Sequence, residues 1–236
     1  MQTITETANL HRLTRLGMFN SFLVREGAEL TLVDTNFPAS ATPILKAASS
    51  LGVPITRIAL THAHFDHVGS LDELAKALPQ VEVIIGPREA RLLRGDFLLD
   101  PGESGKRLFG FKRTNTAVHR TVNDGDRVGS LRVIDCPGHT PGHIAFLDER
   151  DGSLIAGDSY MTQKGVIAAG VFSVLFPMPA WFSWNLELSA RSAAKLAALK
   201  PTRLAVGHGP TVTSPAVAMD DAVELAYRQH PAARTP

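Results

Sequence analysis

The stretch "THAHFDH", Thr61–His67, places three histidines and one aspartate within seven residues of a 236-residue chain that has nine histidines in all. The apolar, β-branched segment "ITRIAL" precedes it, and "VGSLDELAKAL", which has helical periodicity, follows it. The cluster is therefore predicted to lie where a strand gives way to a helix, a usual place for a site in an α/β protein. Residues two apart on an extended chain point to the same side, so His62 and His64 can face one ion together.

These residues carry more ligand groups than one metal ion requires. His62, His64, Asp66 and His67 are four candidates, whereas a tetrahedral Zn²⁺ that keeps one position open for water needs three. The excess predicts two metals, with further ligands supplied from elsewhere in the chain. The other candidates lie at expected strand ends or in glycine-rich turns: His139 in "CPGHTPGH", Asp158 in "IAGDS" and His208 in "VGHGP".

One choice among these candidates stays open on spacing alone. His143 lies four residues after His139, and either imidazole has the chemistry of a ligand. Cys136, three residues before His139, is interpreted as a small buried residue and not as a ligand. His11, His119 and His230 have no motif around them and are expected at the surface.

Hydrophobic periodicity and turn residues predict an α/β fold in which helices cover packed sheets. No linker-like stretch divides the chain, so residues 1–236 are expected to form a single domain. Residues 95–117 show no clear period and are expected to form a long surface loop or lid. The expected strands lie within 18–26, 29–35, 55–61, 81–85, 118–138, 143–148, 152–158 and 202–209. The expected helices lie within 40–52, 70–79, 185–201 and 214–230.

Composition and charge exclude several classes of partner. The net charge is +1 and no run of Lys or Arg occurs, which argues against a nucleic-acid partner. With a single cysteine no intrachain disulfide can form, and the first 23 residues do not have the pattern of a signal peptide. A cytoplasmic location is therefore expected.

Residues 165–184, "GVIAAGVFSVLFPMPAWFSW", form an uncharged segment long enough to span a bilayer. Pro177 and Pro179 interrupt it, so membrane contact is not expected. One interpretation is that the segment forms an apolar pocket wall. The alternative is that its aromatic side chains fill the core or an interface between subunits of a homo-oligomer. The side chains concerned are Phe172, Phe176, Trp181 and Trp184.

The motifs "THAHFDH", "PGHTPGH", "AGD" and "GHG", in this order and at these intervals, resemble the metallo-β-lactamase superfamily over about residues 34–208. The resemblance implies a four-layer αβ/βα sandwich with a dinuclear metal site at one edge. It also implies that Asp34 supports the site from behind the ligands. The first metal would be held by His62, His64 and His139, the second by Asp66, His67 and His208, and Asp158 would bridge both.

The resemblance implies a hydrolase in which two divalent ions, foremost Zn²⁺ with Fe or Mn as alternatives, share a hydroxide that attacks the substrate. Asp66 or Asp158 would then protonate the leaving group. An aspartate at 158 argues against a dedicated β-lactamase, which commonly has a cysteine or another residue there. Tyr160 lies near the place of a carbonyl-polarising tyrosine in lactonases, although the spacing differs by one.

The implied ligand set, which consists of Asp and His alone, matches hydroxyacylglutathione hydrolases and acyl-homoserine lactonases. The nearly neutral tail "SPAVAMDDAVELAYRQHPAARTP" differs from the basic, glutathione-binding region of the former. The expected substrate is therefore a small molecule that has an apolar portion, and the bond to be cleaved in it is an ester, lactone or thioester bond. The alternative is a non-haem iron dioxygenase that acts on a thiol or persulfide, because persulfide dioxygenases resemble the same pattern.

Overall fold

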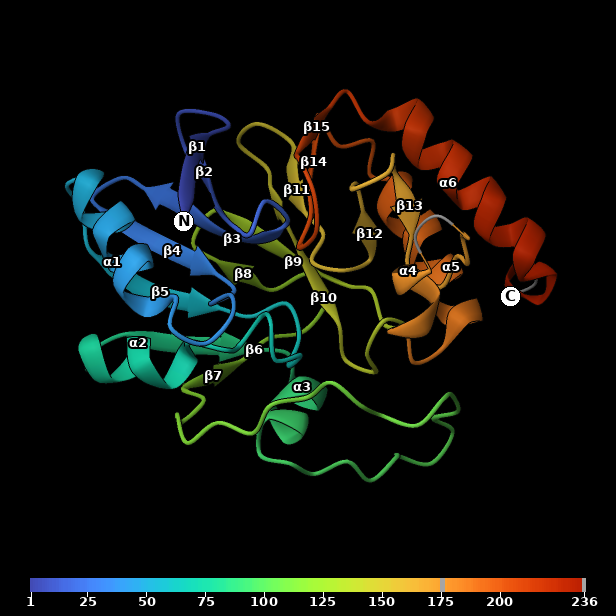
Figure 1. The fold of residues 1–236 in the computed structure, drawn as a ribbon, viewed down its shortest axis with the longest axis horizontal. Helices are drawn as coiled ribbons and strands as arrows, with labels where there is room; N and C mark the ends of the chain where they lie inside the picture. The colour runs from blue at the N-terminus through green and yellow to red at the C-terminus, as the bar shows by residue number, and fades with distance from the viewer. Residues whose placement is uncertain (175–176, 235–236) are drawn as a thin grey trace.

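The computed structural model describes residues 1–174 and 177–234. Within these residues, the first half of the chain forms a seven-stranded sheet whose strands lie side by side in chain order (Figure 1). The sheet is antiparallel from β1 to β4 and parallel from β4 to β7. Its strands are β1 (Gln2–Thr5), β2 (Leu10–Arg15), β3 (Phe19–Glu26), β4 (Glu29–Val33), β5 (Ile55–Ala59), β6 (Glu82–Ile85) and β7 (Arg120–Thr121).

The second half of the chain forms a six-stranded sheet, counted over the same described residues, in the order β15-β14-β11-β10-β9-β8. β11 and β14 are parallel, and the other pairs are antiparallel. Its strands are β8 (Arg127–Val128), β9 (Leu131–Asp135), β10 (Ile144–Asp148), β11 (Ser153–Ile155), β14 (Arg203–Ala205) and β15 (Val212–Thr213). A separate hairpin pairs β12 (Tyr160–Met161) with β13 (Ile167–Ala168).

Helices cover the outer face of each sheet. α1 (Ala41–Ser50), α2 (Leu71–Ala77) and α3 (Pro87–Leu93) follow β4, β5 and β6 and pack on the first sheet. α5 (Leu186–Ala197) and α6 (Ala216–Gln229) pack on the second (Figure 1). The short helix α4 (Met178–Trp181) precedes α5, and a 3₁₀ turn (Pro231–Arg234) follows α6.

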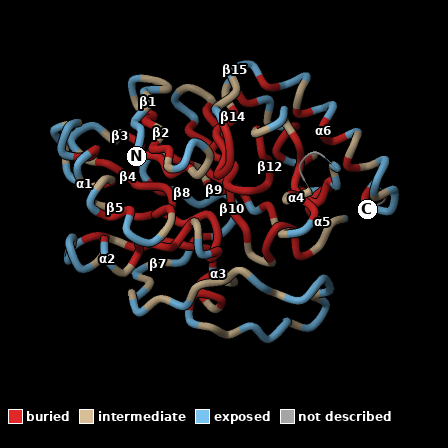
Figure 2. Tube along the Cα trace, in the orientation of Figure 1, coloured by how far each residue is buried: buried red, intermediate tan, exposed pale blue. Residues whose placement is uncertain are grey.

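Strand β10 shows how alternation creates the layers. Its Ile144 and Phe146 pack between the two sheets, whereas Ala145 and Leu147 face the helices α5 and α6. Figure 2 shows the consequence: the buried chain lies in the sheets, and the outer turns of the helices are exposed. The predicted four-layer αβ/βα sandwich is thus confirmed.

Most predicted elements occur where the sequence placed them, and β10 and β11 pair as an antiparallel hairpin. Asn185 caps α5, because its side chain accepts a hydrogen bond from the Leu188 N–H at 2.9 Å. Residues 95–117 contain no helix or extended strand, in agreement with the predicted loop. The elements that were not predicted are β1, β2, β12, β13, β15, α3, α4 and the 3₁₀ turn.

The uncharged segment 165–184 is folded into short pieces. It contributes β13 and the single-turn helix α4, which begins just after Pro177. Throughout the part of the chain that the structure describes, no helix combines the length and the apolar character needed to cross a bilayer.

Candidate metal centre

The seven predicted ligands converge at one edge of the sandwich, where strands from both sheets end. Residues 62–67 follow β5 of the first sheet. His139 follows β9, Asp158 follows β11, and His208 follows β14 of the second sheet. Because β11 and β14 are parallel neighbours, their carboxyl ends bring Asp158 and His208 to the same edge.

The donor atoms form three overlapping groups, and within each group the atoms lie within 4.8 Å of one another. His64 Nδ1 lies 3.0 Å from His139 Nε2. The carboxylate of Asp158 lies between two other imidazoles: its Oδ1 is 3.2 Å from His67 Nε2, and its Oδ2 is 2.9 Å from His208 Nε2. The groups are His62 with His64 and His139, His62 with His67 and Asp158, and Asp66 with His67 and His208.

Unpartnered polar atoms show that a cation fits this cluster. His62 Nε2, His67 Nε2 and Asp158 Oδ1 are buried and have no hydrogen-bond partner among the described residues. Leaving such an atom unsatisfied costs about 1–3 kcal/mol. Five imidazoles and two carboxylates are a donor set that suits Zn²⁺, Fe²⁺ or Mn²⁺. The cluster therefore has both buried donor atoms without a hydrogen-bond partner and the ligand chemistry of a metal centre.

Burial and neighbouring charges set the protonation of the ligands. Burial lowers the pKa of His62 and His139 well below the usual value and that of His64 to about 4, so all three are neutral, as metal ligands must be. Burial also opposes a charge on His208, but the Asp158 carboxylate outweighs it and raises the pKa of His208 to about 9. In the metal-free protein a proton on His208 thus compensates the charge of Asp158.

Asp34 supports the cluster from behind. It follows β4 with a left-handed φ of 60°, a conformation that aspartate tolerates better than most residues. Its Oδ1 accepts the Thr61 N–H at 2.8 Å, and its Oδ2 accepts the Thr61 hydroxyl at 2.8 Å. Oδ2 also lies 2.8 Å from Nδ1 of His67. A proton on Nδ1 leaves Nε2 free to bind a metal, which fits the supporting place implied for Asp34.

His143 has a different environment from His139. Its Nε2 accepts the backbone N–H of Asp158 at 3.1 Å, and its Nδ1 lies 3.2 Å from the Cys136 sulfur. His143 therefore belongs to none of the three groups and holds the backbone of Asp158 instead. Cys136 is buried as expected, and burial raises the pKa of its thiol to about 12.

The structure does not bring Tyr160 to the cluster. Its buried hydroxyl donates to the Ala193 carbonyl at 2.7 Å, inside the core beneath α5. The expectation for His11 is wrong: this side chain is buried against Thr5, because β2 has a neighbouring strand on each side. Sequence reasoning also missed Asn20, whose amide donates to the carbonyls of Val206 and Gly209 on both sides of His208.

A small apolar pocket of about 90 Å³ opens beside the cluster. Five candidate ligands line it together with apolar side chains: His64, Asp66, His139, Asp158 and His208. The loop 95–117 closes one side, since the Gly110 carbonyl accepts the Phe65 N–H at 2.9 Å. The apolar lining consists of Phe19, Phe37, Phe65, Met161, Met178 and Phe182.

The segment 165–184 contributes to this pocket through other residues than predicted. Met178 and Phe182 lie one helical turn apart, so they share the face of α4 that meets the pocket. Trp181 points elsewhere and is 59% exposed. Phe172 is also exposed, Phe176 lies outside the described residues, and Trp184 lines a smaller neighbouring cavity with His64 and His139.

Comparisons with known proteins agree with this geometry. The family model described as "Metallo-beta-lactamase superfamily" matches residues 14–208. The probable metallo-hydrolase YflN of Bacillus subtilis (strain 168) is 32% identical over 225 residues, covering 87% of this chain and 84% of that protein. A hydroxyacylglutathione hydrolase of Rhodospirillum rubrum is 35% identical over 65% of this chain, but the match spans only 52% of that enzyme.

A solved structure shows the same fold with metal bound. The crystal structure of TTHA1623 in a di-iron-bound form superposes with a TM-score of 0.65 at 27% identity, covering 88% of this chain and 95% of that one. Family match, relatives and ligand geometry agree. The chain belongs to the metallo-beta-lactamase superfamily.

Proposed function

We propose that this protein is a dinuclear metal-dependent hydrolase that cleaves a small, apolar ester, lactone or thioester. The observation that carries the proposal is the pocket, in which five of the candidate metal ligands face six apolar side chains. Family membership supports metal-dependent hydrolysis in general. The pocket supports the more specific choice of substrate.

Each candidate ligand has a part in this assignment. His62, His64 and His139 would hold one metal, and His67, His208 and Asp66 the other, with Asp158 shared. Bound metals would supply Lewis-acid chemistry, because they lower the pKa of water and polarise a substrate carbonyl. Asp66 lines the pocket, and its carboxylate is the more accessible of the two, so it is placed to pass a proton to the leaving group.

The lining of the pocket favours a neutral substrate. Among the described residues that line it, none is a lysine or an arginine. A phosphodiester or the carboxylate of a β-lactam would find no lysine or arginine beside the metal positions, and its polar groups would lose water against the apolar wall. An acyl chain would instead be stabilised by about 0.8 kcal/mol per buried CH₂. The hydroxyacylglutathione hydrolase relative supports a thioester as one of the candidate bonds.

A second candidate remains because a similar chain was solved with two irons. Imidazole and carboxylate ligands accept iron as well as zinc. With iron, the alternative activity is oxidation of a thiol or persulfide by O₂.

The test is a substrate panel against protein loaded separately with Zn²⁺, Mn²⁺ or Fe²⁺. The panel contains neutral acyl esters, lactones, acyl thioesters, a phosphodiester and a β-lactam, and O₂ consumption is followed with thiols and persulfides. We expect the highest kcat/KM with neutral acyl compounds, with or without air. Turnover restricted to thiols or persulfides, dependent on O₂ and iron, would replace the hydrolase by the dioxygenase.

A further inference from the structure

Glu89 is a fully buried carboxylate that the proposed chemistry does not use. It lies on α3, and its two oxygens accept from two different loops. Oε2 accepts the Ala63 N–H at 2.8 Å, and Oε1 accepts the Gly142 N–H at 2.9 Å. Burial raises the pKa of Glu89. A buried carboxylate is costly, so its two backbone contacts call for an explanation.

The two loops are those that carry the ligands of the first metal. Ala63 lies between His62 and His64, and Gly142 lies three residues after His139. Glu89 therefore joins the loop after β5 to the loop after β9 from behind, through backbone groups only. Among the described hydrogen bonds, Glu89 itself accepts from no ligand side chain.

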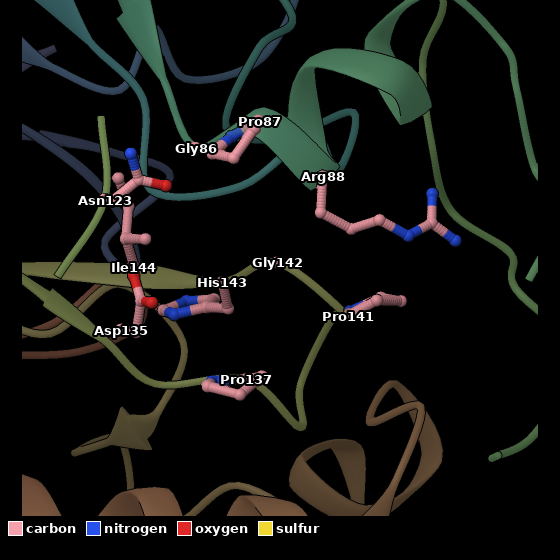
Figure 3. A pocket seen from close by; sticks show the side chains of 10 residues that line it. All are labelled: Gly86, Pro87, Arg88, Asn123, Asp135, Pro137, Pro141, Gly142, His143 and Ile144. Carbon is pink, nitrogen blue, oxygen red and sulfur yellow. The ribbon is translucent and has the colours of Figure 1, made fainter. Parts of the chain in front are cut away.

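α3 is packed closely against the second of these loops. A Cβ added to Gly142 would lie 2.6 Å from the Cβ of Arg88 and 3.0 Å from the backbone nitrogen of Glu89. A Cβ added to Gly86 would lie 3.2 Å from the Gly142 carbonyl oxygen. Figure 3 shows the start of α3 facing the loop with Pro141, Gly142 and His143. Beside their contact, these two segments line a cavity of about 150 Å³. This close approach sets the distance that Glu89 spans.

We propose that Glu89 is a positioning residue that sets the affinity of the first metal site by holding its two ligand loops together. The inference rests on the ligand assignment in the proposed function. Both carboxylate oxygens are required, because each accepts from one loop. Groups behind the ligands of a metal site typically change metal affinity by about 10–100-fold when they are lost.

Glu89→Gln is the sharpest test, because the amide has the same size but only one acceptor. Its NH₂ group must face one of the two backbone N–H groups, so one loop loses its partner. We expect the Kd for the first Zn²⁺ to rise about 10–100-fold, measured by competition with a chelator. The Kd for the second Zn²⁺ should change less, because its ligand His67 is held separately by Asp34 and its ligand His208 lies in a loop that Glu89 does not contact.

Glu26→Gln is the matched control. Glu26 Oε1 also accepts a backbone N–H, from Ser130 at 3.0 Å, together with the Ser130 hydroxyl at 3.0 Å, but neither residue is in a ligand loop. This variant should lower the free energy of unfolding, because the ion pair of Oε2 with Arg150 at 3.6 Å is lost, without changing either Zn²⁺ Kd. Gly142→Ala is the second test variant if Glu89→Gln does not fold. Its added methyl group would push the same loop away from α3 and lower the Zn²⁺ affinity of the first site as well.

The outcomes separate the two proposals. If wild-type protein binds no Zn²⁺, the metal assignment itself fails. If wild-type protein binds two Zn²⁺ and Glu89→Gln binds both with unchanged Kd, Glu89 is only structural and the inference is overturned. A structural role alone would lower the Tm of the metal-free protein and leave the gain in Tm on adding Zn²⁺ equal to that of wild type.

Discussion

Asp34 Oδ2 lies 2.8 Å from Nδ1 of His67, and the same oxygen accepts the hydroxyl of Thr61. The pair joins the end of β4 to the histidine cluster after β5. It fixes the ring of His67 with Nε2 directed at Asp158, 3.2 Å from Oδ1. The orientation of a candidate ligand is thus set by a residue on a different strand.

Replacing Asp34 should therefore weaken the second metal site. Asp34→Ala removes the acceptor for Nδ1–H and frees the His67 ring to rotate or change tautomer, so we expect the Kd for the second Zn²⁺ to rise about 10–100-fold. Chelator competition measures this change. Equal Kd values for Asp34→Ala and wild type would show that the contact does not tune the metal site.

Asp158 is the predicted bridge, and its loss should impair both metal retention and catalysis. Asp158→Ala leaves two cations without the shared negative charge between them. We expect loss of the second metal and a fall in kcat of at least ~10²-fold, the scale of a lost electrostatic contribution to the transition state. Metal analysis and steady-state kinetics on the same preparation test this. Two retained metals with near-normal kcat would reassign the residue.

Metal affinity should depend on pH through His208. Asp158 raises the pKa of His208 to about 9, so at neutral pH an incoming metal must displace a proton. The apparent Zn²⁺ affinity should rise as the pH increases from 7 and level off as it passes about 9. Calorimetry in buffers of different ionisation enthalpy measures the released protons. Binding at pH 7 without proton release would contradict a protonated His208.

The metal-free protein should have its own stability profile. The pKa of His208 is higher in the folded state than the unfolded value of about 6.5, so its contribution is fully present below pH 6.5 and is lost as the pH rises through about 9. The folded pKa of His64 is lowered to about 4, so stability also falls as the pH drops from 6.5 towards 4. Urea unfolding of chelator-treated protein should therefore give maximal stability near pH 6.5, and a minimum there would refute the assignment.

The pocket predicts which aromatic residue governs substrate preference. Phe182 lines the pocket beside the metal ligands, whereas Trp181 is exposed next to it. Phe182→Ala should reduce the increase of kcat/KM with acyl chain length, an increase of up to ~0.8 kcal/mol per buried CH₂. Trp181→Ala is the matched control and should leave that dependence unchanged. If Trp181→Ala alone reduces it, the substrate binds outside this pocket.

The sequence predicted the layers and the clustering of the candidate ligands because both depend on local patterns. The apolar run of β10 and the spacing in "THAHFDH" can be read from a few neighbouring residues. The contact partner of a side chain cannot be read in this way when the partner is distant in the sequence. Glu89 and Ala63 are 26 residues apart, and the Asn20 amide bonds a carbonyl 186 residues away, so neither contact leaves a local signal.

Two misplaced residues show the same limit. Tyr160 follows Asp158 by two residues, but a turn at residues 157–159 separates it from Asp158 before β12 begins, and Tyr160 points towards α5, where Ala193 accepts its hydroxyl. In the segment 165–184, apolar composition left a pocket wall and a packed core or interface as alternatives, and it did not determine which residues face the pocket. The single turn of α4 decides that Met178 and Phe182 face the pocket and Trp181 does not.

The central claim is that seven side chains form two metal sites that share Asp158. Metal content per chain, measured by elemental analysis after saturation with Zn²⁺ and removal of excess metal, tests it most directly. The ligand set predicts about two ions per chain in wild type and about one in Asp158→Ala. A saturated wild-type protein that holds a single ion, with activity unchanged by further metal, would contradict the dinuclear assignment.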